Sequence, residues 1–337
     1  MSGLIELAHA GFGNSIQDAG RLGYRHMGIT VSGYLDRYFA RCANALVGNA
    51  PEDACIEIRA YGPTLQVQQG PVRVAVTGNM NFRIIRADGS EEEGMPWQSI
   101  LLHEQDTLES VEVNGGVAYM AIGGGILTPM QLGSRSTYQR AQIGGIDGRL
   151  LANGDFLPCG LAAELESGER KGSPWEYAND PVRVILGPQE GHFKPESVRE
   201  FLETEYKVTA QMDRMGMRLE GPALQHVAKE AADIVSDGIT PGAIQVPGNG
   251  LPIVLLADCQ TVGGYPKIAT IILADLPRLA QLKPDQMIRF QAVNAVQARA
   301  ALVEREDCWH AWEKTLTSIR LDDREEEGDD GSYCVAV

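Results

Sequence analysis

The chain has 337 residues, of which 44% are hydrophobic and 22% charged, and its formal net charge is −16 at pH 7. This length predicts two domains, and the composition is typical of a globular protein that buries its core without cross-links. The negative charge argues against nucleic acid or an anionic membrane as a partner, because both would repel the chain. Residues 322–330 contain seven acidic side chains and one arginine, so the rest of the chain is only moderately acidic.

The six cysteines fit neither a metal site nor a disulfide framework. They are scattered, with no C-x-x-C pair and no histidines at ligand spacing: Cys42, Cys55, Cys159, Cys259, Cys308 and Cys334. We therefore expect reduced thiols and no bound metal. The sequence starts without a basic and apolar leader and has no run of eighteen apolar residues, so we expect a cytoplasmic protein without a membrane span.

The first predicted domain, residues 1–175, is an antiparallel β-barrel or sandwich. Short apolar runs bounded by turn residues recur at positions 4–8, 55–59, 64–67, 72–77, 82–85, 99–102, 107–111 and 117–122. One helix interrupts them, with Ser32 or a neighbour as its cap and Gly48 at its end. Its apolar stripe has helical spacing: Leu35, Tyr38, Phe39, Cys42, Leu46 and Val47.

The second predicted domain, residues 181–318, follows a linker at 171–180 that contains glycine, proline and asparagine. Its elements are a strand at 182–186, a helix at 195–205, strands around Ile244 and at 253–257 and 268–273, and a short helix at 276–281. A strand at 287–290 closes the unit, and a terminal helix runs from about Val296 to Leu316. We expect the acidic tail, residues 319–337, to be disordered. The fold class is therefore mainly β with a few helices.

Four polar clusters combine basic and acidic side chains with glycine, at residues 17–36, 135–149, 213–218 and 258–267. A guanidinium matches a carboxylate with two parallel hydrogen bonds, so arginines grouped in glycine-containing loops indicate an anion site. The candidate residues are Asp18, Arg21, Ser32, Asp36, Arg135, Thr137, Asp213, Arg214, Arg218, Gln260, Tyr265 and Lys267. We predict that they converge on one hollow.

The same clusters also fit a purely structural interpretation. Asp18 would then pair with Arg21, Asp213 with Arg218, and Lys267 would be solvated in a tight hairpin. Other familiar sites are missing from the sequence: it has no P-loop, no G-x-G-x-x-G followed by a downstream acid, and no G-x-S-x-G. Nothing is similar to the Ala-Met-Lys-Met site that carries biotin, so the chain is not its own biotin carrier.

Long motifs in this chain resemble the allophanate hydrolase subunit 2 family, also called the biotin-dependent carboxyltransferase-related family. They are SIQDAGRLGYRHMGITVSGYLD (15–36), RSTYQRAQIGGIDGR (135–149), GPQEGHF (187–193), DRMGMRLEG (213–221) and GAIQVPGNGLPIVLLADCQTVGGYPKIATIILADLPRLAQL (242–282). The resemblance spans about residues 4–290 and implies two cyclophilin-like β-barrel units. Cys259 stands where many relatives carry arginine.

The resemblance also implies an activity, because the family includes the C subunit of bacterial 5-oxoprolinase. The chain would act with the A subunit and with the B subunit, which is related to allophanate hydrolase subunit 1, to open 5-oxo-L-proline to L-glutamate. The complex would use ATP, this chain would bind no cofactor by itself, and it would be inactive alone. In this hypothesis the catalytic residues are Lys267, Asp18, Arg21, Asp213 and Arg214, and the substrate-binding residues are Ser32, Asp36, Arg135, Thr137, Arg218, Gln260 and Tyr265.

Two alternatives remain open from the sequence. The family also includes part of urea carboxylase, so the chain could be the carboxyltransferase component of a biotin-dependent urea or amide carboxylase, served by carboxybiotin from a separate carrier. It could instead be a regulatory binding partner of a homologue of the B subunit, because some family members antagonise an inhibitor of a sporulation kinase. Whether the active site lies within the chain or at its interface with the B subunit also stays open.

Overall fold

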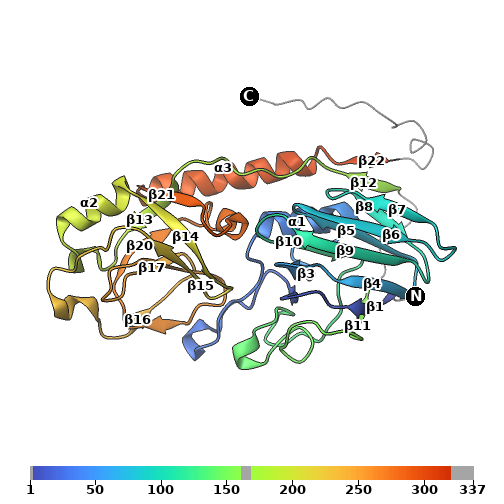
Figure 1. The fold of residues 1–337 in the computed structure, drawn as a ribbon, viewed down its shortest axis with the longest axis horizontal. Helices are drawn as coiled ribbons and strands as arrows, with labels where there is room; N and C mark the ends of the chain where they lie inside the picture. The colour runs from blue at the N-terminus through green and yellow to red at the C-terminus, as the bar shows by residue number, and fades with distance from the viewer. Residues whose placement is uncertain (1–2, 161–167, 320–337) are drawn as a thin grey trace.

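The structure is a computed structural model that describes residues 3–160 and 168–319. Two β-rich units lie side by side, and a long helix runs along both of them (Figure 1). The described residues are mainly β, with three α-helices and one closed barrel, which confirms the predicted fold class. None of these helices is long and apolar enough to cross a membrane. The predicted disordered tail lies outside the described residues from position 320 onward.

The first unit consists of two antiparallel sheets around a shared hydrophobic core. Alternate residues along the strands, such as Ile5 and Leu7, are fully buried between the sheets because successive side chains of a strand point to opposite faces. One sheet has the order β11 (Phe156–Cys159), β1 (Gly3–His9), β4 (Thr64–Gln69), β9 (Thr107–Val113), β6 (Met80–Ile85) and β7 (Glu91–Gly94). The other has the order β2 (Ser15–Gln17), β3 (Cys55–Ile58), β10 (Ala118–Ile122), β5 (Val72–Thr77) and β8 (Ser99–Leu102).

Helix α1 (Arg37–Val47) packs on β5 and β10, which explains why all six residues of β5 are buried. The helix starts at Asp36, whose carboxylate accepts hydrogen bonds from the backbone nitrogens of Tyr38 and Phe39. It ends at Gly48, which has a left-handed φ of 79°. The helix was predicted at this position with Ser32 or a neighbour as its cap; the cap is Asp36 and not Ser32.

The second unit is a closed seven-stranded barrel around its own core. Its strand order is β13 (Val182–Leu186), β20 (Lys267–Ile271), β17 (Ala243–Gln245), β18 (Ile253–Leu255), β15 (Gly216–Glu220), β14 (Glu205–Met212) and β21 (Met287–Ala292). Strand β21 pairs with both β13 and β14, so it closes the barrel as predicted. Helix α2 (Pro195–Glu203) covers β21, where the rings of Phe201 and Phe290 stack at 4.6 Å.

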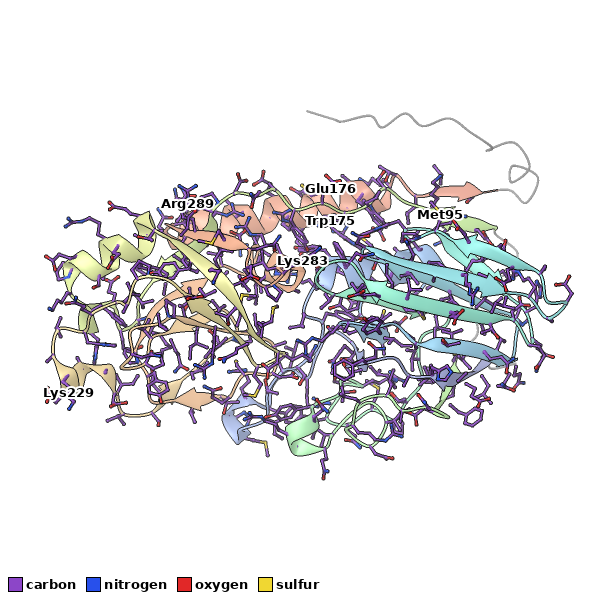
Figure 2. All side chains as sticks on the ribbon, in the orientation of Figure 1. Met95, Trp175, Glu176, Lys229, Lys283 and Arg289 are labelled. Carbon is purple, nitrogen blue, oxygen red and sulfur yellow. The ribbon has the colours of Figure 1, made fainter. Side chains whose placement is uncertain are left out.

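The terminal helix α3 (Ala295–Glu313) joins the two units, although the sequence placed it in the second one. Ala301 packs into a small cluster with Ile272 of the second unit, whereas Trp309 and Trp312 pack into the cluster around α1. After the helix, β22 (Thr317–Ile319) pairs with β12 (Glu169–Lys171) of the first unit. The segment between β12 and β13 also lies at this joint, and Figure 2 labels its Trp175 beside α3. The Trp175 ring stacks on that of Tyr38, with 5.1 Å between the ring centroids.

Candidate functional site

The polar clusters of the sequence lie largely at the junction between the two units. From the first unit come the loop between β2 and α1, which includes η1 (Arg25–Met27), and the loop between β10 and β11, which includes η2 (Gln139–Ala141). Hydrogen bonds cross the junction here: the Thr30 hydroxyl donates to the Ala257 carbonyl at 2.9 Å, and Arg25 donates to the Ile239 carbonyl. The loop between β2 and α1 therefore faces turns of the second barrel.

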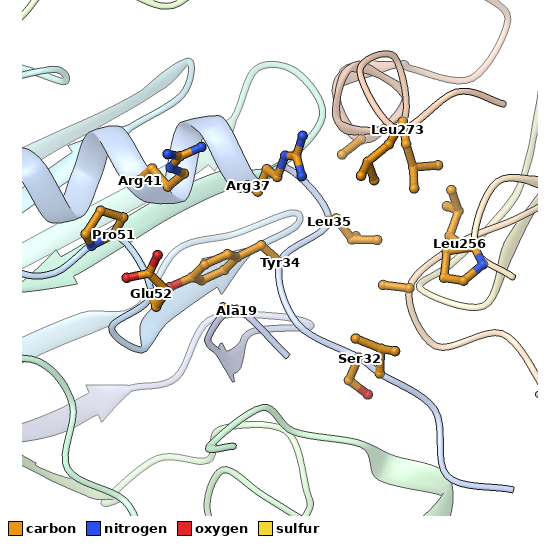
Figure 3. A pocket seen from close by; sticks show the side chains of 15 residues that line it. Ala19, Ser32, Tyr34, Leu35, Arg37, Arg41, Pro51, Glu52, Leu256 and Leu273 are labelled. Carbon is orange, nitrogen blue, oxygen red and sulfur yellow. The ribbon is translucent and has the colours of Figure 1, made fainter. Parts of the chain in front are cut away.

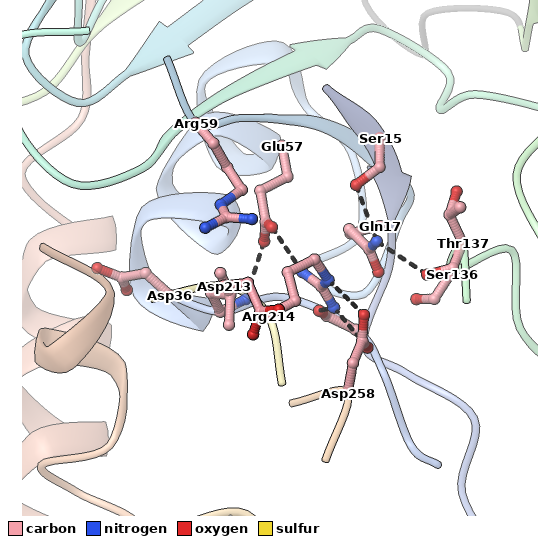
Figure 4. A network of polar contacts seen from close by, with 12 residues as sticks. Ser15, Gln17, Asp36, Glu57, Arg59, Ser136, Thr137, Asp213, Arg214 and Asp258 are labelled. Atoms are coloured by element: carbon pink, nitrogen blue, oxygen red, sulfur yellow. Dashed lines mark hydrogen bonds and ion pairs between the residues drawn. The ribbon is translucent and has the colours of Figure 1, made fainter. Parts of the chain in front are cut away.

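Arg214 is the hub of this junction (Figure 4). Its Nη1 donates to Glu57 Oε1 in the first unit at 2.5 Å, and its Nε donates to Asp258 Oδ2 in the second unit at 2.8 Å. Nη2 donates to the Gly33 carbonyl at 2.6 Å and to Asp258 Oδ1 at 3.1 Å. Burial acts to lower the pKa of Arg214, but the charges of Asp258 and Glu57 outweigh it and raise the pKa. One guanidinium thus ties the two units together.

Asp18 has different partners from those of the structural interpretation. Its carboxylate accepts hydrogen bonds from the hydroxyls of Ser134 at 2.6 Å and Ser136 at 2.5 Å, and from the backbone nitrogens of Arg135 and Gly20. The predicted bond to Arg21 is replaced by these four neutral donors. A carboxylate held in this way anchors the loop between β10 and β11 to the start of the loop after β2.

Arg21 is fully buried beside Asp18 and donates to backbone carbonyls, to Gln131 at 3.0 Å and to Ser136 at 2.8 Å. Burial lowers the pKa of its guanidinium, and the charges of Asp18 and Asp258 oppose this effect. Its Nη1 is buried and has no hydrogen-bond partner among the described residues. This nitrogen is therefore a donor that remains available inside the junction.

Two glycines allow the loop between β10 and β11 to close around these groups. A side chain at Gly144 would place its Cβ 1.9 Å from the Ser136 carbonyl oxygen, and one at Gly145 would lie 2.1 Å from Thr137 Oγ1. Both glycines have positive φ values, of 73° and 54°. Thr137 Oγ1 is buried and unpartnered among the described residues, whereas the Arg135 side chain donates to the Thr128 carbonyl. Arg135 is thus used to shape the loop.

Lys267 is buried in the second unit, not solvated. Its Nζ donates to Asp237 Oδ2 at 2.9 Å and to the Gly238 carbonyl at 3.1 Å, both on the short strand β16 (Asp237–Gly238). The hydrogen bond from Lys267 is the main cause that lowers the pKa of Asp237. Strand β16 pairs with β19 (Val262–Gly263), so the lysine is covered by this two-stranded ribbon.

Gln260 and Tyr265 belong to the same group as Lys267. The Gln260 side chain donates to Gln245 Oε1 at 3.4 Å, and the Gln245 side chain donates to the Tyr265 carbonyl at 3.3 Å. We call Lys267, Asp237, Gln245, Gln260 and Tyr265 the lysine group. Two adjacent residues connect it to the junction: the Gly238 carbonyl accepts a hydrogen bond from Lys267, and the Ile239 carbonyl accepts one from Arg25. Sequence reasoning placed Lys267 and the arginines in one hollow, but their described contacts form two neighbouring groups.

Three other predicted residues have local roles in the structure. Asp36 is fully buried and, besides capping α1, accepts hydrogen bonds from the Tyr177 hydroxyl at 2.7 Å and from Gln281 Nε2 of the second unit at 2.9 Å. Burial raises the pKa of Asp36 to about 6. Asp213 closes the turn between β14 and β15 by accepting from two backbone nitrogens, and it is not bonded to Arg218. Arg218 lies exposed on β15.

A pocket of about 380 Å³ opens at the same junction (Figure 3). Of the predicted site residues, Ser32 lines it. Its other lining residues are Ala19, Val31, Tyr34, Leu35, Arg37, Arg41, Pro51 and Glu52 of the first unit and Pro241, Leu256, Ala257, Leu273, Leu276 and Ala280 of the second. No group of three or more His, Cys, Asp or Glu side chains in the described part of the chain is arranged to hold a metal ion.

Four acidic or hydroxyl side chains of the junction are absent from the candidate residues predicted from the sequence. Asp258 and Ser136 lie within the predicted clusters, whereas Glu57 and Ser134 lie outside them. The signal for Glu57 was present, because it is a lone acid within the apolar run of β3 and is fully buried. A buried acid without a partner on its own strand implies a cation supplied from elsewhere in the fold. The sequence does not say that Arg214, from the other unit, is this cation.

This architecture is that of a known family: residues 27–292 match the family "Carboxyltransferase domain, subdomain A and B", and the chain belongs to it. The chain is 34% identical over 304 residues to the C subunit of 5-oxoprolinase from Escherichia coli K12, and the match covers 88% of this chain and 94% of that protein. It is 35% identical over 285 residues to the C subunit of 5-oxoprolinase from Haemophilus influenzae, over 84% of this chain and 89% of the relative.

A solved structure has the same fold. The crystal structure of urea amidolyase from K. lactis superposes with a TM-score of 0.82 at 27% sequence identity over 92% of this chain. The chain spans only 20% of the length of that enzyme. The likeness therefore concerns one part of a larger protein, whereas the two bacterial relatives match over nearly their whole length.

Proposed function

We propose that this chain is the C subunit of an ATP-dependent 5-oxoprolinase and acts with its A and B subunits in the cytoplasm to open 5-oxo-L-proline to L-glutamate. The observation that carries the proposal is the end-to-end match to two proteins of this name, at 34% and 35% identity over 94% and 89% of their lengths. A match of this extent covers both units and the junction between them.

The chemistry of this reaction suits the groups at the junction. In an ATP-dependent reaction the lactam oxygen would take the terminal phosphoryl group of ATP, and ADP would leave. Water then adds to the lactam carbon, the ring C–N bond breaks, the nitrogen takes up a proton to become the amino group of glutamate, and phosphate is released. The carbonyl oxygen gains negative charge on the way, and preorganised cationic donors stabilise such charge most strongly where water is excluded. Arg21 has an unpartnered buried donor, and Lys267 is a buried ammonium whose carboxylate partner, Asp237, is half exposed.

In this proposal some of the predicted residues contact the substrate, and others hold the loops and units in place. Arg21 and Lys267 stabilise the developing charge or a phosphorylated intermediate, and Lys267 exchanges Asp237 for the substrate anion. Arg214 fixes the two units relative to each other, while Asp18 and Asp213 hold the loops that carry the cations. ATP is bound by the complex, and this chain by itself binds no cofactor.

The test is reconstitution with the A and B subunits encoded by the same genome. We expect glutamate release from 5-oxo-L-proline that requires ATP and all three proteins. The control omits each of the three in turn, and the chain alone should be inactive. A complete complex that hydrolyses neither the lactam nor ATP in its presence would contradict the proposal. A stable complex with the B subunit that shows no turnover with any third component would favour the regulatory role.

The second candidate is a biotin-dependent carboxyltransferase, and the superposition on urea amidolyase favours it. In that case carboxybiotin would arrive from a separate carrier and its carboxyl group would pass to urea or another amide. A carboxylation assay with bicarbonate, ATP and a biotin-carrying partner separates the candidates. Activity abolished by avidin would support the transferase, whereas lactam hydrolysis insensitive to avidin would support the oxoprolinase.

A further inference from the structure

Several large apolar side chains at the lower edge of the junction lie open to solvent. The five that matter here are 40–72% exposed: Leu22, Met27, Met130, Leu132 and Val262. We call these five residues the apolar face. Large apolar side chains that are exposed together, with polar groups around them, mark surfaces where a protein binds a partner.

Hydrogen bonds hold the two loops of the first unit that carry this face beside each other. The Arg21 guanidinium donates to the Gln131 carbonyl at 3.0 Å, which joins the loop after β2 to the loop after β10. Leu22 directly follows the donor, and Met130 and Leu132 flank the acceptor. Figure 1 shows the two loops, one blue and one green, protruding side by side at the lower edge of the molecule.

The ribbon of β16 and β19 extends the apolar face onto the second unit. Arg25, two residues before Met27, donates to the carbonyl of Ile239. Val262 pairs with Gly238, which directly precedes Ile239. The apolar face therefore crosses the junction and includes residues of both units.

The apolar face borders the cations that the proposed function requires. Leu22 directly follows Arg21, whose Nη1 is buried and has no hydrogen-bond partner in the described part of the chain. Val262 belongs to the ribbon that covers Lys267, and the carboxylate partner of this lysine, Asp237, is 53% exposed. Charge that develops on a substrate is stabilised most strongly where water is excluded, so the lysine group needs a cover.

The two loops of the apolar face are basic, although the chain as a whole is acidic. Residues 19–35 and 123–146 contain no aspartate or glutamate, in a chain with 45 acidic residues and a net charge of −16. Their charged and titratable side chains are four arginines and one histidine: Arg21, Arg25, His26, Arg135 and Arg140. The acid of the ribbon, Asp237, is already bonded to Lys267. A surface that is both apolar and basic is complementary to a protein surface that is apolar and acidic.

We infer that the apolar face docks the B subunit, through an apolar and acidic surface of that subunit, an inference that rests on the proposed function. The bound B subunit covers the lysine group and the loop that carries Arg21, so the active site is closed only in the complex. The chain alone is then inactive because water reaches the lysine group. A membrane is less suited to this face, since the net charge of −16 repels an anionic bilayer.

Calorimetric titration with the B subunit, in the absence of substrate, tests the face directly. Leu22→Asp combined with Met130→Asp should raise the Kd about 30-fold or more, the scale of losing an interface hot spot. Arg140→Glu, which reverses an exposed charge, should raise the Kd by about tenfold. Added salt should weaken wild-type binding, and it should weaken the binding of Arg140→Glu less, because salt screens the attraction that this variant has lost.

Two variants outside the face are the matched controls. Met95→Asp changes an exposed methionine at the opposite edge of the first unit (Figure 2), and Arg199→Glu reverses an exposed arginine on α2. Both should leave the Kd unchanged, and urea denaturation of every variant verifies that it is folded. Hydrogen exchange of the wild-type chain needs no variant: the B subunit should slow amide exchange in residues 20–28 and 127–142 and leave α2 unchanged.

The outcomes separate the docking face from the proposed function. A wild-type Kd in the double variant, with glutamate release by the complete complex intact, would overturn the face and leave the proposed function standing. Weakened binding in the double variant, with no lactam hydrolysis by the wild-type complex, would support the face and refute the activity. A wild-type chain that binds no B subunit would refute both. Vesicles of phosphatidylglycerol are the last arm: binding to them that only the double variant loses, with unchanged affinity for the B subunit, would assign the face to a membrane and overturn the inference.

Discussion

Arg214 and Lys267 are both buried cations with carboxylate partners, but the partners lie in different surroundings. Arg214 forms ion pairs with two buried acids, Glu57 from the first unit and Asp258 from the second. Lys267 pairs with Asp237, whose side chain is 53% exposed. Losing Arg214 would therefore leave two buried charges unpaired, whereas losing Lys267 would leave one carboxylate that water can solvate.

We propose that this difference separates a structural cation, Arg214, from a cation that takes part in the reaction, Lys267. A buried charge that loses its partner destabilises the fold strongly, so Arg214 is committed to the junction. An ammonium whose partner can move into water can exchange that partner for a substrate anion at small cost. Stability and activity, measured on the same variants, distinguish the structural role of Arg214 from the role of Lys267 in the reaction.

The largest effect is expected for Arg214→Met, which removes the guanidinium but keeps most of the side-chain volume. The free energy of unfolding should fall by about 3–5 kcal/mol, because Glu57 and Asp258 are left buried without a cation. Urea denaturation of the full chain measures it. Arg214→Lys should recover only part of the loss, since an ammonium lacks the planar fork that donates two parallel hydrogen bonds to Asp258 and a third to Glu57. A decrease of less than about 1 kcal/mol for Arg214→Met would show that Arg214 does not stabilise the junction through Glu57 and Asp258.

Asp36 makes stability depend on pH in the acidic range. Burial raises its pKa from the ordinary 3.8 to about 6, so the folded chain holds a proton that the unfolded chain releases between these values. Stability is therefore lost as pH rises from about 4 to 6, by roughly 3 kcal/mol in total for this group. Denaturation at pH 4, 5 and 6 should show a shallower decline in Asp36→Asn, which keeps a capping side chain but does not titrate. Equal slopes for the two proteins would contradict this assignment.

Lys267→Ala should reduce glutamate release by the complete complex about 100-fold or more, the scale of losing one donor to a developing oxyanion. Its effect on unfolding should be much smaller than that of Arg214→Met, because Asp237 is left half exposed. Glutamate release and urea denaturation of the same preparation give both values. Asp237→Asn is the control for the ion pair. Unchanged turnover in Lys267→Ala would remove the lysine from the mechanism.

Most of the fold could be predicted from local pattern. The predicted strands at 72–77, 99–102 and 182–186 coincide with β5, β8 and β13, because apolar runs bounded by turn residues carry a strong strand signal. The hairpin of β14 and β15 was not predicted. Its strands alternate buried and exposed residues, so they contain no continuous apolar run, and its turn was interpreted as a site motif.

The site was less predictable because its contacts are long-range. Sequence spacing suggested that Asp18 pairs with Arg21, three residues away, yet Asp18 bonds to Ser134 and Ser136, more than a hundred residues along the chain. Arg214 likewise meets Glu57 across 157 positions. Residue type and glycine content indicate which loops carry polar clusters. The packing of the two units determines which charged side chains form ion pairs and hydrogen bonds.

The smallest effect is expected for Arg218→Ala, and it sharpens the comparison because Arg218 lies only four residues from Arg214. Its side chain is exposed on β15, so the free energy of unfolding should change by less than about 0.5 kcal/mol. Turnover of the complete complex should stay within twofold of wild type, since the arginine lies outside both the pocket and the lysine group. A large loss of activity with unchanged stability would show that this exposed arginine contacts the substrate or another protein of the complex, as its sequence motif suggested. Arg218 on β15 would then be a second cation, besides Lys267, that serves the reaction and not the stability of the fold.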